Sequence, residues 1–283
     1  MHPVLFRFPE AIPLIGGVTV NSFGVMLYLA FVAGGAIIHV GFNRRGYEGA
    51  RAWDLVFWTL IAGLVGAKLY WVFAHPALLA ADPAGTLFSG EGLTWYGGFA
   101  LGVFVYWLCL RRMEIPAGEG LDALGLALPV AIAVGRVGCF LAGDDYGGPT
   151  DSALGIAFPE GHPPTTVEVL ERRFGLTVDP GLVERYGEVI PVHPAQLYEV
   201  GISLLVFVVV FLARDHPHRA GWLFALWLSL YGVQRFVIEL VRVNPRVFLG
   251  LTVAQLLSLA ALGLGAYLLA RLRGSEAGAE ART

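Results

Sequence analysis

Four polar side chains lie well inside apolar stretches of the sequence, where they could bind an anion or move a proton. They are Lys68, Tyr96, Arg136 and Arg235. An arginine at membrane depth costs roughly 2.5–3.5 kcal/mol on insertion scales, so it is tolerated where it faces protein, water or an anionic ligand. Its planar guanidinium can donate to two phosphate oxygens at once. We therefore interpret Arg136 as the floor of an anion-binding site.

A polar stripe surrounds Arg235. Tyr231, Arg235, Glu239 and Arg242 are spaced i, i+4, i+8 and i+11, which places them on one face of an otherwise apolar helix. Glu239 can pair with either arginine and hold its guanidinium in place. The alternative is a stripe of structural ion pairs without a ligand.

The composition indicates which elements must position these residues. The chain has 283 residues, of which 56% are hydrophobic and 14% are charged, whereas a soluble domain carries about a quarter charged residues. This predicts an all-α, polytopic integral membrane protein. The net charge of −3 says nothing about nucleic acid, but the sequence has no basic patch suited to it, so we expect no nucleic-acid partner. The N-terminus has no cationic region before a short apolar core, so we expect no cleaved signal peptide.

Seven apolar stretches predict seven transmembrane helices, since about 20 residues at 1.5 Å each span a bilayer. They are residues 21–43, 54–75, 95–110, 121–143, 196–212, 221–241 and 250–270. We expect five regions: an interfacial segment 1–20, helices one to four in 21–143, an external head 144–195, helices five to seven in 196–270, and a tail 271–283. Within the proline-rich head we expect one short helix near 166–174.

Basic residues alternate between successive loops. Arginines follow the first, third, fifth and seventh helices, whereas residues 76–94, after the second helix, contain neither lysine nor arginine. Positively charged loops stay on the cytoplasmic side. The pattern predicts an external N-terminus, an external head and a cytoplasmic C-terminus.

The four polar residues are predicted to share one depth. Counted from the cytoplasmic end of its helix, each lies 14 or 15 residues along, which is roughly 21–23 Å. Three cations and a phenol in one layer of the outer half of the membrane predict a site for an anionic group.

The remaining reactive residues give weaker signals. His193 precedes Pro194 at the start of the fifth helix and could be a base or a hydrogen-bonding residue of the helix start. The other histidines have no metal-like spacing, so we expect no metal. Cys109 and Cys139 are too few for a disulfide framework. We interpret Cys139 as a small apolar filler of its helix and not as a nucleophile.

These residues resemble the motifs of the prolipoprotein diacylglyceryl transferase family. Members of this family are bacterial membrane enzymes with seven helices. The family signature reads roughly G-R-x-G-N-F-x-N-x-E-x-x-G, and Gly135, Arg136, Gly138, Phe140 and Gly147 fit it. Further matching pieces follow the family order: Tyr96-Gly97-Gly98, His193-Pro194-x-Gln196-Leu197-Tyr198-Glu199, the stripe from Tyr231 to Arg242, and Gln255 to Ser258.

The resemblance implies a defined reaction in the bacterial plasma (inner) membrane, without a cofactor. The diacylglyceryl group of phosphatidylglycerol is transferred to the lipobox cysteine of a secreted prolipoprotein, which forms a thioether and releases glycerol phosphate. The implied catalytic residues are Arg136, Arg235, Tyr96 and Glu239. The implied phosphatidylglycerol-binding residues are Arg136, Arg235, Lys68, Tyr231, Gly98, Asp144, Gly147 and His193.

The acceptor thiol must become a thiolate before it attacks. Tyr96, His193 and Glu239 are candidates for the base. A tyrosine is a poor base at neutral pH, so we favour a role of the cationic layer in stabilising the thiolate. Tyr96 would then orient the lipid head group.

The sequence departs from the family pattern at several positions. The signature asparagines are Cys139 and Ala142, the glutamate is Asp144, the usual histidine is Tyr96, a common tyrosine is Phe23, and a common arginine is Lys68. Two rival functions therefore stay open: an anionic-lipid transporter or scramblase, and a catalytically inactive lipid-binding paralogue. A transporter usually shows related halves with broken helices, and no such repeat is evident in the sequence.

Overall fold

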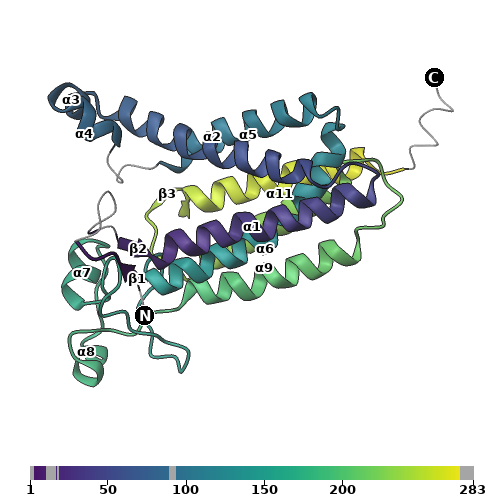
Figure 1. Cartoon of the computed structure of the whole chain (residues 1–283). Coiled ribbons are helices and arrows are strands. Elements are labelled where there is room, and N and C mark those ends of the chain that lie inside the picture. The colour runs from purple at the N-terminus through teal and green to yellow at the C-terminus, as the bar shows by residue number, and fades with distance from the viewer. Residues whose placement is uncertain (1–2, 11–16, 18, 89–93, 275–283) are drawn as a thin grey trace. The chain divides into compact units, whose positions relative to one another are not determined.

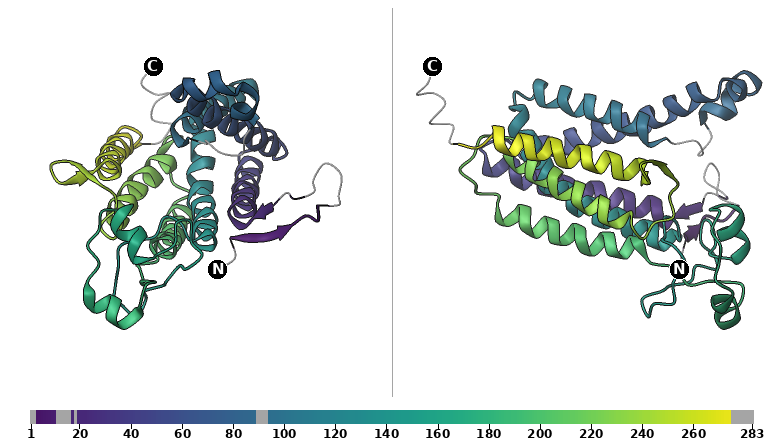
Figure 2. Two further views of the ribbon diagram at one scale, coloured as in Figure 1. Left: turned by 90° about the vertical axis from the view of Figure 1, so that its left-hand side faces the viewer. Right: turned by 180° about the vertical axis from the view of Figure 1, so that it is seen from behind.

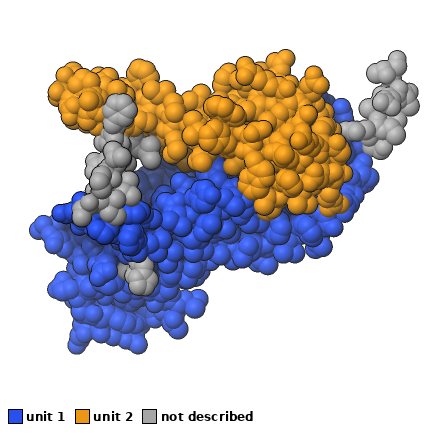
Figure 3. Space-filling view, in the orientation of Figure 1, with its two compact units in different colours: residues 1–34, 125–283 blue, residues 35–124 orange. Residues whose placement is uncertain are grey.

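The computed structural model describes residues 3–10, 17, 19–88 and 94–274. The chain forms two compact units, which Figure 3 distinguishes by colour. Unit 1 combines residues 1–34 with 125–283, and unit 2 comprises residues 35–124. The boundaries between them fall within two long helices, α1 (Ser22–Arg44) and α6 (Ala117–Ala142).

Unit 1 is a bundle of long apolar helices with a head at one end (Figures 1 and 2). Besides its parts of α1 and α6, it contains α9 (Ala195–Leu212), α10 (Trp222–Ile238) and α11 (Val253–Arg271). Small residues bring the helices together, as expected between membrane helices. A Cβ on Gly232 of α10 would lie 2.8 Å from the carbonyl oxygen of Ser258 in α11. Between α9 and α10, Gln234 Nε2 donates a hydrogen bond of 2.6 Å to Ser203 Oγ.

The head follows α6 and leads into α9. It contains two short helices, α7 (Val167–Arg172) and α8 (Pro180–Tyr186), each with a side chain that caps its first turn. Its core consists of apolar side chains contributed by residues far apart in the segment. They are Tyr146, Phe158, Leu170, Val178, Ile190 and Val192. Phe140, near the end of α6, packs against this core, so the head is attached to the bundle and does not form a separate domain.

Two small antiparallel hairpins complete unit 1. Strand β1 (Val4–Arg7) pairs with β2 (Thr19–Asn21), and β3 (Arg246–Phe248) pairs with β4 (Leu251–Thr252). The second hairpin fills the connection between α10 and α11. The all-α prediction is therefore correct for the long elements and omitted these strands.

Unit 2 is organised around the crossing of α2 (Arg51–Ala74) with α5 (Trp95–Arg112). A Cβ on Gly97 would lie 2.2 Å from the carbonyl oxygen of Gly66, so only glycine permits this close approach. Two short helices, α3 (Pro76–Ala81) and α4 (Pro83–Phe88), lie in the predicted 76–94 loop. Residues 89–93 of that loop are outside the described residues.

All seven predicted apolar stretches contain helices, and their ends differ from the prediction by a few residues. Five of the described helices, α1, α2, α6, α9 and α11, are long and apolar enough to span a membrane. Helix α10 has 17 residues and is a shorter apolar helix. It ends at Ile238 and not at residue 241, and α11 begins at Val253 and not at residue 250, because the chain between them turns through β3 and β4.

The short helix predicted near 166–174 is present as α7. The second helix of the head, α8, was not predicted. Its sequence nevertheless carries a start signal, because Asp179 Oδ1 accepts from Gly181 N at 2.9 Å and Pro180 occupies the first helical position.

Candidate active site

The polar residues of unit 1 converge where four of its helices meet the head. Helices α6 and α10 end here, whereas α9 and α11 begin here. Arg136 lies six residues before the end of α6, and Arg235 lies three residues before the end of α10. At 1.5 Å per residue these positions are about 9 Å and about 4.5 Å from the helix ends. The site is therefore close to the head but within the apolar helices.

Arg136 is bound by two carboxylates through two different nitrogens of its guanidinium. Its Nη1 lies 2.7 Å from Asp145 Oδ2, and its Nε pairs with Glu199 Oε2 of α9. Its Nη1 also lies 3.6 Å from Cys139 Sγ, one turn further along α6. Arg136 thus connects the end of α6 with both the head loop and α9.

Glu199 links the two arginines that the sequence singled out. Its side chain is only 3% exposed, and its Oε1 lies 3.6 Å from Arg235 Nη1 while Oε2 pairs with Arg136. A carboxylate this deeply buried is stable only beside cations or hydrogen-bond donors. Arg136 and Arg235, separated by almost 100 residues, are therefore held at one place by a single acid.

Glu239 holds Arg235 from the other side. Its Oε2 lies 3.0 Å from Arg235 Nη2, so the stripe pairs Glu239 with Arg235 and not with Arg242. Its Oε1 accepts hydrogen bonds from Asn244 Nδ2 at 2.7 Å and from Thr252 Oγ1 at 2.8 Å. Thr252 also forms a reciprocal capping box with Gln255 at the start of α11.

Arg242 completes the chain of ion pairs through Asp145. Arg242 Nη2 lies 2.5 Å from Asp145 Oδ1. The network runs in the order Arg242, Asp145, Arg136, Glu199, Arg235 and Glu239, alternating three arginines with three carboxylates. The charges balance, and several buried atoms are left without a hydrogen bond among the described residues, including Arg235 Nη1 and Arg242 Nη1.

Gly147 brings the head loop against the end of α10. It forms a β-bridge with Arg242, and its N–H donates to the carbonyl oxygen of His193 at 2.8 Å. A Cβ at Gly147 would lie 2.5 Å from the carbonyl oxygen of Val241. Glycine is therefore needed to let the two backbones approach, which places Arg242 beside Asp145.

The two consecutive aspartates after α6 differ in their ionisation. Burial raises the pKa of Asp144 to about 6, and the neighbouring charge of Asp145 adds to the shift. Burial also acts to raise the pKa of Asp145, but Arg242 and Arg136 outweigh it and hold that pKa below its ordinary value. Asp145 is thus the partner of the arginines that is ionised at neutral pH.

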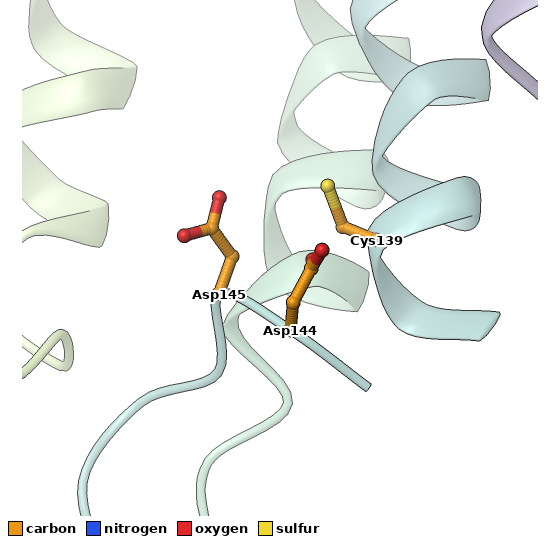
Figure 4. Close-up of side chains that lie close together, drawn as sticks. All are labelled: Cys139, Asp144 and Asp145. Carbon is orange, nitrogen blue, oxygen red and sulfur yellow. The ribbon is translucent and has the colours of Figure 1, made fainter. Parts of the chain in front are cut away.

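Cys139, Asp144 and Asp145 place one potential ligand atom each within 4.8 Å of one another (Figure 4). This spacing resembles a metal site. However, both Asp145 oxygens are engaged by arginines, and Arg136 Nη1 lies beside the Cys139 sulfur. A second cation would be repelled there, so we assign the cluster no metal, and the expectation that the protein needs none stays a prediction.

The residues at the start of α9 support the loop geometry. The His193 ring contacts the Tyr198 hydroxyl, with Nδ1 and the oxygen 3.3 Å apart, and its backbone binds Gly147 and Gly148. Gln196 is fully buried and donates from Nε2 to the carbonyl oxygen of Asp144 at 2.5 Å. His193 therefore lies at the edge of the site with local hydrogen bonds of the kind expected at a helix start.

Tyr231 lies one turn before Arg235 on α10 and stacks on Trp227, with ring centroids 5.3 Å apart. It belongs to the same face of α10 as Arg235 and Glu239, as the spacing predicted.

Lys68, Tyr96 and Gly98 belong to unit 2. Lys68 Nζ lies 5.0 Å from the ring centre of Trp71 on the same helix. Tyr96 is 56% exposed near the start of α5, and its ring is 6.3 Å from that of Tyr70. A Cβ on Gly98 would lie 2.9 Å from the carbonyl oxygen of Gly63, so this glycine serves the crossing of α2 and α5. The layer predicted to unite Lys68 and Tyr96 with the arginines stays a prediction.

A cleft of about 310 Å³ opens beside the ion-pair network in unit 1. Asp144, Asp145, Cys139, Arg173, Arg242 and Asn244 contribute to its walls. Among the described residues that line it, Asp145 and Arg242 are the members of the network. Asp145 therefore stands at the surface of the cleft, with Arg136 bound behind it.

Sequence reasoning missed two members of the network, Glu199 and Asp145. Glu199 was noted only as the last residue of a motif, although a glutamate four residues into an apolar helix is itself a signal of a buried partner. Asp145 follows Asp144 directly, and only Asp144 was aligned with the glutamate of the family signature. Neither partner could be assigned without the fold of the head, which brings the chain back to α6.

Comparison of the sequence with known proteins identifies a family. The sequence model of a family described as prolipoprotein diacylglyceryl transferase matches residues 9–271. Similar proteins include a phosphatidylglycerol–prolipoprotein diacylglyceryl transferase from Mycobacteroides abscessus, which is 31% identical over 95% of this chain and 78% of its own length. One of the same name from Nitratidesulfovibrio vulgaris is 29% identical over 98% of this chain and its own full length. The chain therefore belongs to the prolipoprotein diacylglyceryl transferase family.

Proposed function

We propose that this transferase moves the diacylglyceryl group of phosphatidylglycerol to the lipobox cysteine thiol of a prolipoprotein. Family membership supports the reaction, and similar proteins carry both substrates in their names. The observation that carries the proposal is the pair Arg136 and Arg235, held together by Glu199 inside apolar helices. Two guanidinium groups at one place form a receptor for the lipid phosphate.

The chemistry follows from charge. The cysteine thiolate attacks the glyceryl carbon that bears the phosphate ester, a sulfur–carbon bond forms, and the carbon–oxygen bond to phosphate breaks. The leaving group is glycerol phosphate, whose phosphate gains negative charge as the bond breaks. Arg136 and Arg235 stabilise that charge, the type of interaction that typically contributes most to catalysis. The thiol proton is taken up by the base that generates the thiolate, or it is carried away by the released glycerol phosphate.

Further residues have supporting roles in this proposal. Glu239 and Glu199 orient the Arg235 guanidinium, and Tyr231 extends the same face of α10 toward the lipid. Lys68 and Tyr96 contact the head group from the outer layer of the membrane. Gly98, Gly147, Asp144 and His193 are further proposed phosphatidylglycerol-binding residues, and Gly147 and His193 also hold the backbone of the head loop.

The orientation of the protein follows from its arginines. We propose seven spans, α1, α2, α5, α6, α9, α10 and α11, with the N-terminus and the head outside the bacterial plasma membrane. The described part of the 1–20 segment lies at the membrane interface, the head is 144–195, and the 271–283 tail begins on the cytoplasmic side with residues 271–274. Residues 1–2, 11–16, 18 and 275–283 are outside the described residues. Donor lipid enters sideways between helices, and the signal peptide of the acceptor arrives beneath the head.

Labelling of engineered cysteines tests this topology. An impermeant reagent should modify a cysteine at position 82 in intact cells and spare one at position 273 until the cells are opened. Labelling of position 273 in intact cells contradicts the proposed orientation.

The reaction is tested with the purified full-length protein, phosphatidylglycerol and a synthetic lipobox peptide. We expect a peptide whose mass increases by one diacylglyceryl group, with matching release of glycerol phosphate. Phosphatidylcholine and a peptide with serine in place of the lipobox cysteine are the matched controls. The gene should also rescue bacterial cells depleted of their own transferase.

Each alternative predicts a different result. A transporter or scramblase moves a fluorescent phosphatidylglycerol between leaflets without forming a thioether. An inactive paralogue binds phosphatidylglycerol but gives neither product nor rescue. Either result overturns the proposed reaction.

A further inference from the structure

Asp145 occupies an unusual place in the ion-pair network. It lies on the loop after α6 with a backbone φ of 61°, and 43% of its side chain is exposed. By contrast, Glu199 is 3% exposed and Glu239 is fully buried. Asp145 is thus the one carboxylate of the three that can leave the network without breaking apart the helices.

The carboxylate of Asp145 divides its two oxygens between two arginines. Oδ2 lies 2.7 Å from Arg136 Nη1, and Oδ1 lies 2.5 Å from Arg242 Nη2. Two oxygens of a phosphate group would engage the same two guanidinium groups in the same way. Asp145 therefore occupies donor positions that suit a phosphate.

The cleft gives a phosphate access to this position. Asp145 and Arg242 line the cleft, and Arg173 of the head forms part of the same wall. Arg242 Nη1 is buried without a hydrogen bond among the described residues. An anion that enters the cleft thus meets Arg173 and Arg242 together with the carboxyl of Asp144, and the place between Arg136 and Arg242 is already occupied by the carboxylate of Asp145.

The charge count favours an exchange. With Asp145 bound, three arginines face three carboxylates and the network is neutral. When Asp145 turns into the cleft, the remaining network has one positive charge in excess. The phosphodiester of phosphatidylglycerol carries one negative charge, so its binding restores neutrality, which matters because an unpaired buried charge is costly.

We propose that Asp145 is an internal competitor of the substrate phosphate and thereby sets the affinity for the anionic head group. The proposal rests on the proposed function, because it concerns the phosphate site of that reaction. Arg136 belongs to both arginine pairs, so Arg242 joins Arg136 and Arg235 at this site once Asp145 has left. Asp145 does not take part in bond making. It holds Arg136 and Arg242 in place in the empty enzyme and is displaced when the lipid binds.

The test is Asp145→Asn in the full-length protein, with Asp145→Gly as a second variant. Asparagine and glycine both tolerate a positive φ, so the loop conformation is kept. The matched control is Asp151→Asn, which removes another exposed aspartate of the head whose arginine partner, Arg185, also belongs to the head and not to the ion-pair network. Folding is monitored by circular dichroism and the melting temperature.

Binding of short-chain phosphatidylglycerol and of inorganic phosphate is measured by calorimetry in detergent. We expect both Asp145 variants to bind both probes about 10-fold more tightly than the wild type, which is about 1.4 kcal/mol. Asp151→Asn should bind as the wild type does. The KM for phosphatidylglycerol should fall in the same proportion.

The outcomes separate this inference from the proposed reaction. If inorganic phosphate binds more tightly but the lipid does not bind at all, Asp145 is a competitor at an anion site and the proposed lipid substrate is wrong. If neither probe binds more tightly to either folded variant, the inference about Asp145 is wrong. A loss of affinity together with a lower melting temperature also contradicts it, because Asp145 is then a structural support.

Discussion

Two regions of the molecule place polar residues within apolar helices, and they are built in different ways. In unit 1, Arg136, Glu199 and Arg235 come from three helices and form ion pairs that fix one another. In unit 2, the crossing of α2 and α5 depends on glycine backbones in contact, while Tyr96 stays 56% exposed among aromatic rings. Side chains held by mutual ion pairs can form a binding site of fixed geometry. An exposed tyrosine beside a crossing of glycine backbones can instead change its rotamer when a ligand binds.

The largest expected effect comes from removing an arginine of the network. Arg136→Ala and Arg235→Ala should each lower transfer about 1,000-fold, or about 4 kcal/mol of transition-state stabilisation. Lysine should restore little, because a point charge does not replace the guanidinium fork. The measurement is the initial rate with a lipobox peptide.

Arg172→Ala is the matched control for the arginine variants, because Arg172 is exposed and, among the described residues, forms its ion pair with Glu168 of the same helix. Near-normal transfer by either alanine variant would remove that arginine from the site. Loss of folded protein would instead favour the alternative interpretation of the sequence, in which the stripe consists of structural ion pairs and binds no ligand.

Glu199→Gln tests whether the acid between the arginines organises them. The substitution keeps the size of the side chain but removes the charge that both guanidinium groups share. We expect transfer to fall about 100-fold, or about 2.7 kcal/mol, and the melting temperature to fall as well, because two buried cations lose a partner.

The control for Glu199→Gln is Glu184→Gln on the surface of α8. If Glu199→Gln has a lower melting temperature than the wild type but the wild-type transfer rate, Glu199 contributes only to stability. The ion pairs of unit 1 would then not be needed for transfer.

Tyr96→Phe is expected to have a smaller effect. If Tyr96 orients the head group without acting as the base, transfer should fall about 10-fold, or about 1.4 kcal/mol. The pH–rate profile should keep its shape, because no titrating base has been removed. Tyr267→Phe, at a similarly exposed tyrosine of α11, is the control. Elimination of transfer, or loss of the alkaline-rising limb, would instead assign Tyr96 the base role.

Asp144→Asn should have the smallest effect, on stability and its dependence on pH. The folded pKa of Asp144 is about 6 and its ordinary value is 3.8, so ionisation costs the folded state stability as the pH rises from about 4 to about 6. Asparagine removes this cost. After a discount for the exposed part of the side chain, a gain of about 1 kcal/mol would raise the melting temperature by about 2–4 °C above pH 6.

At pH 4 the Asp144→Asn gain should vanish, because the wild-type carboxyl is then protonated in the folded state. Asp145 has the opposite sign: its lowered pKa contributes stability above about pH 4, and that stability is lost as the pH falls further. A gain that is independent of pH between 4 and 7 would mean that burial of the Asp144 charge is not its cause.

The sequence predicted the helices and the arginines because charged residues stand out in apolar runs. Arg136, Arg235 and Glu239 were all found in this way, and the spacing of the stripe placed Tyr231 on the same face as Arg235 and Glu239. Each of the seven stretches also contains a helix, because apolar runs of this length are typical of membrane helices and not of strands or loops.

The partners of these residues could not be predicted. Glu199 reaches Arg136 only because the head folds back on α6 and returns the chain to the start of α9. Asp145 reaches Arg242 only because Gly147 allows the head loop to approach the end of α10. Such contacts join residues far apart in the chain, and a single sequence does not reveal which distant residues the fold brings together.

The hydroxyl of Thr252 has a consequence for the synthesis of this protein. It accepts from Gln255 N at 3.2 Å to begin α11 and donates to Glu239 at 2.8 Å, which in turn pairs with Arg235. A nascent chain that has reached only α10 therefore lacks a donor on which the acid behind Arg235 depends. The last helix must therefore leave the ribosome and reach α10 before all of the hydrogen bonds that hold Glu239 behind Arg235 are in place.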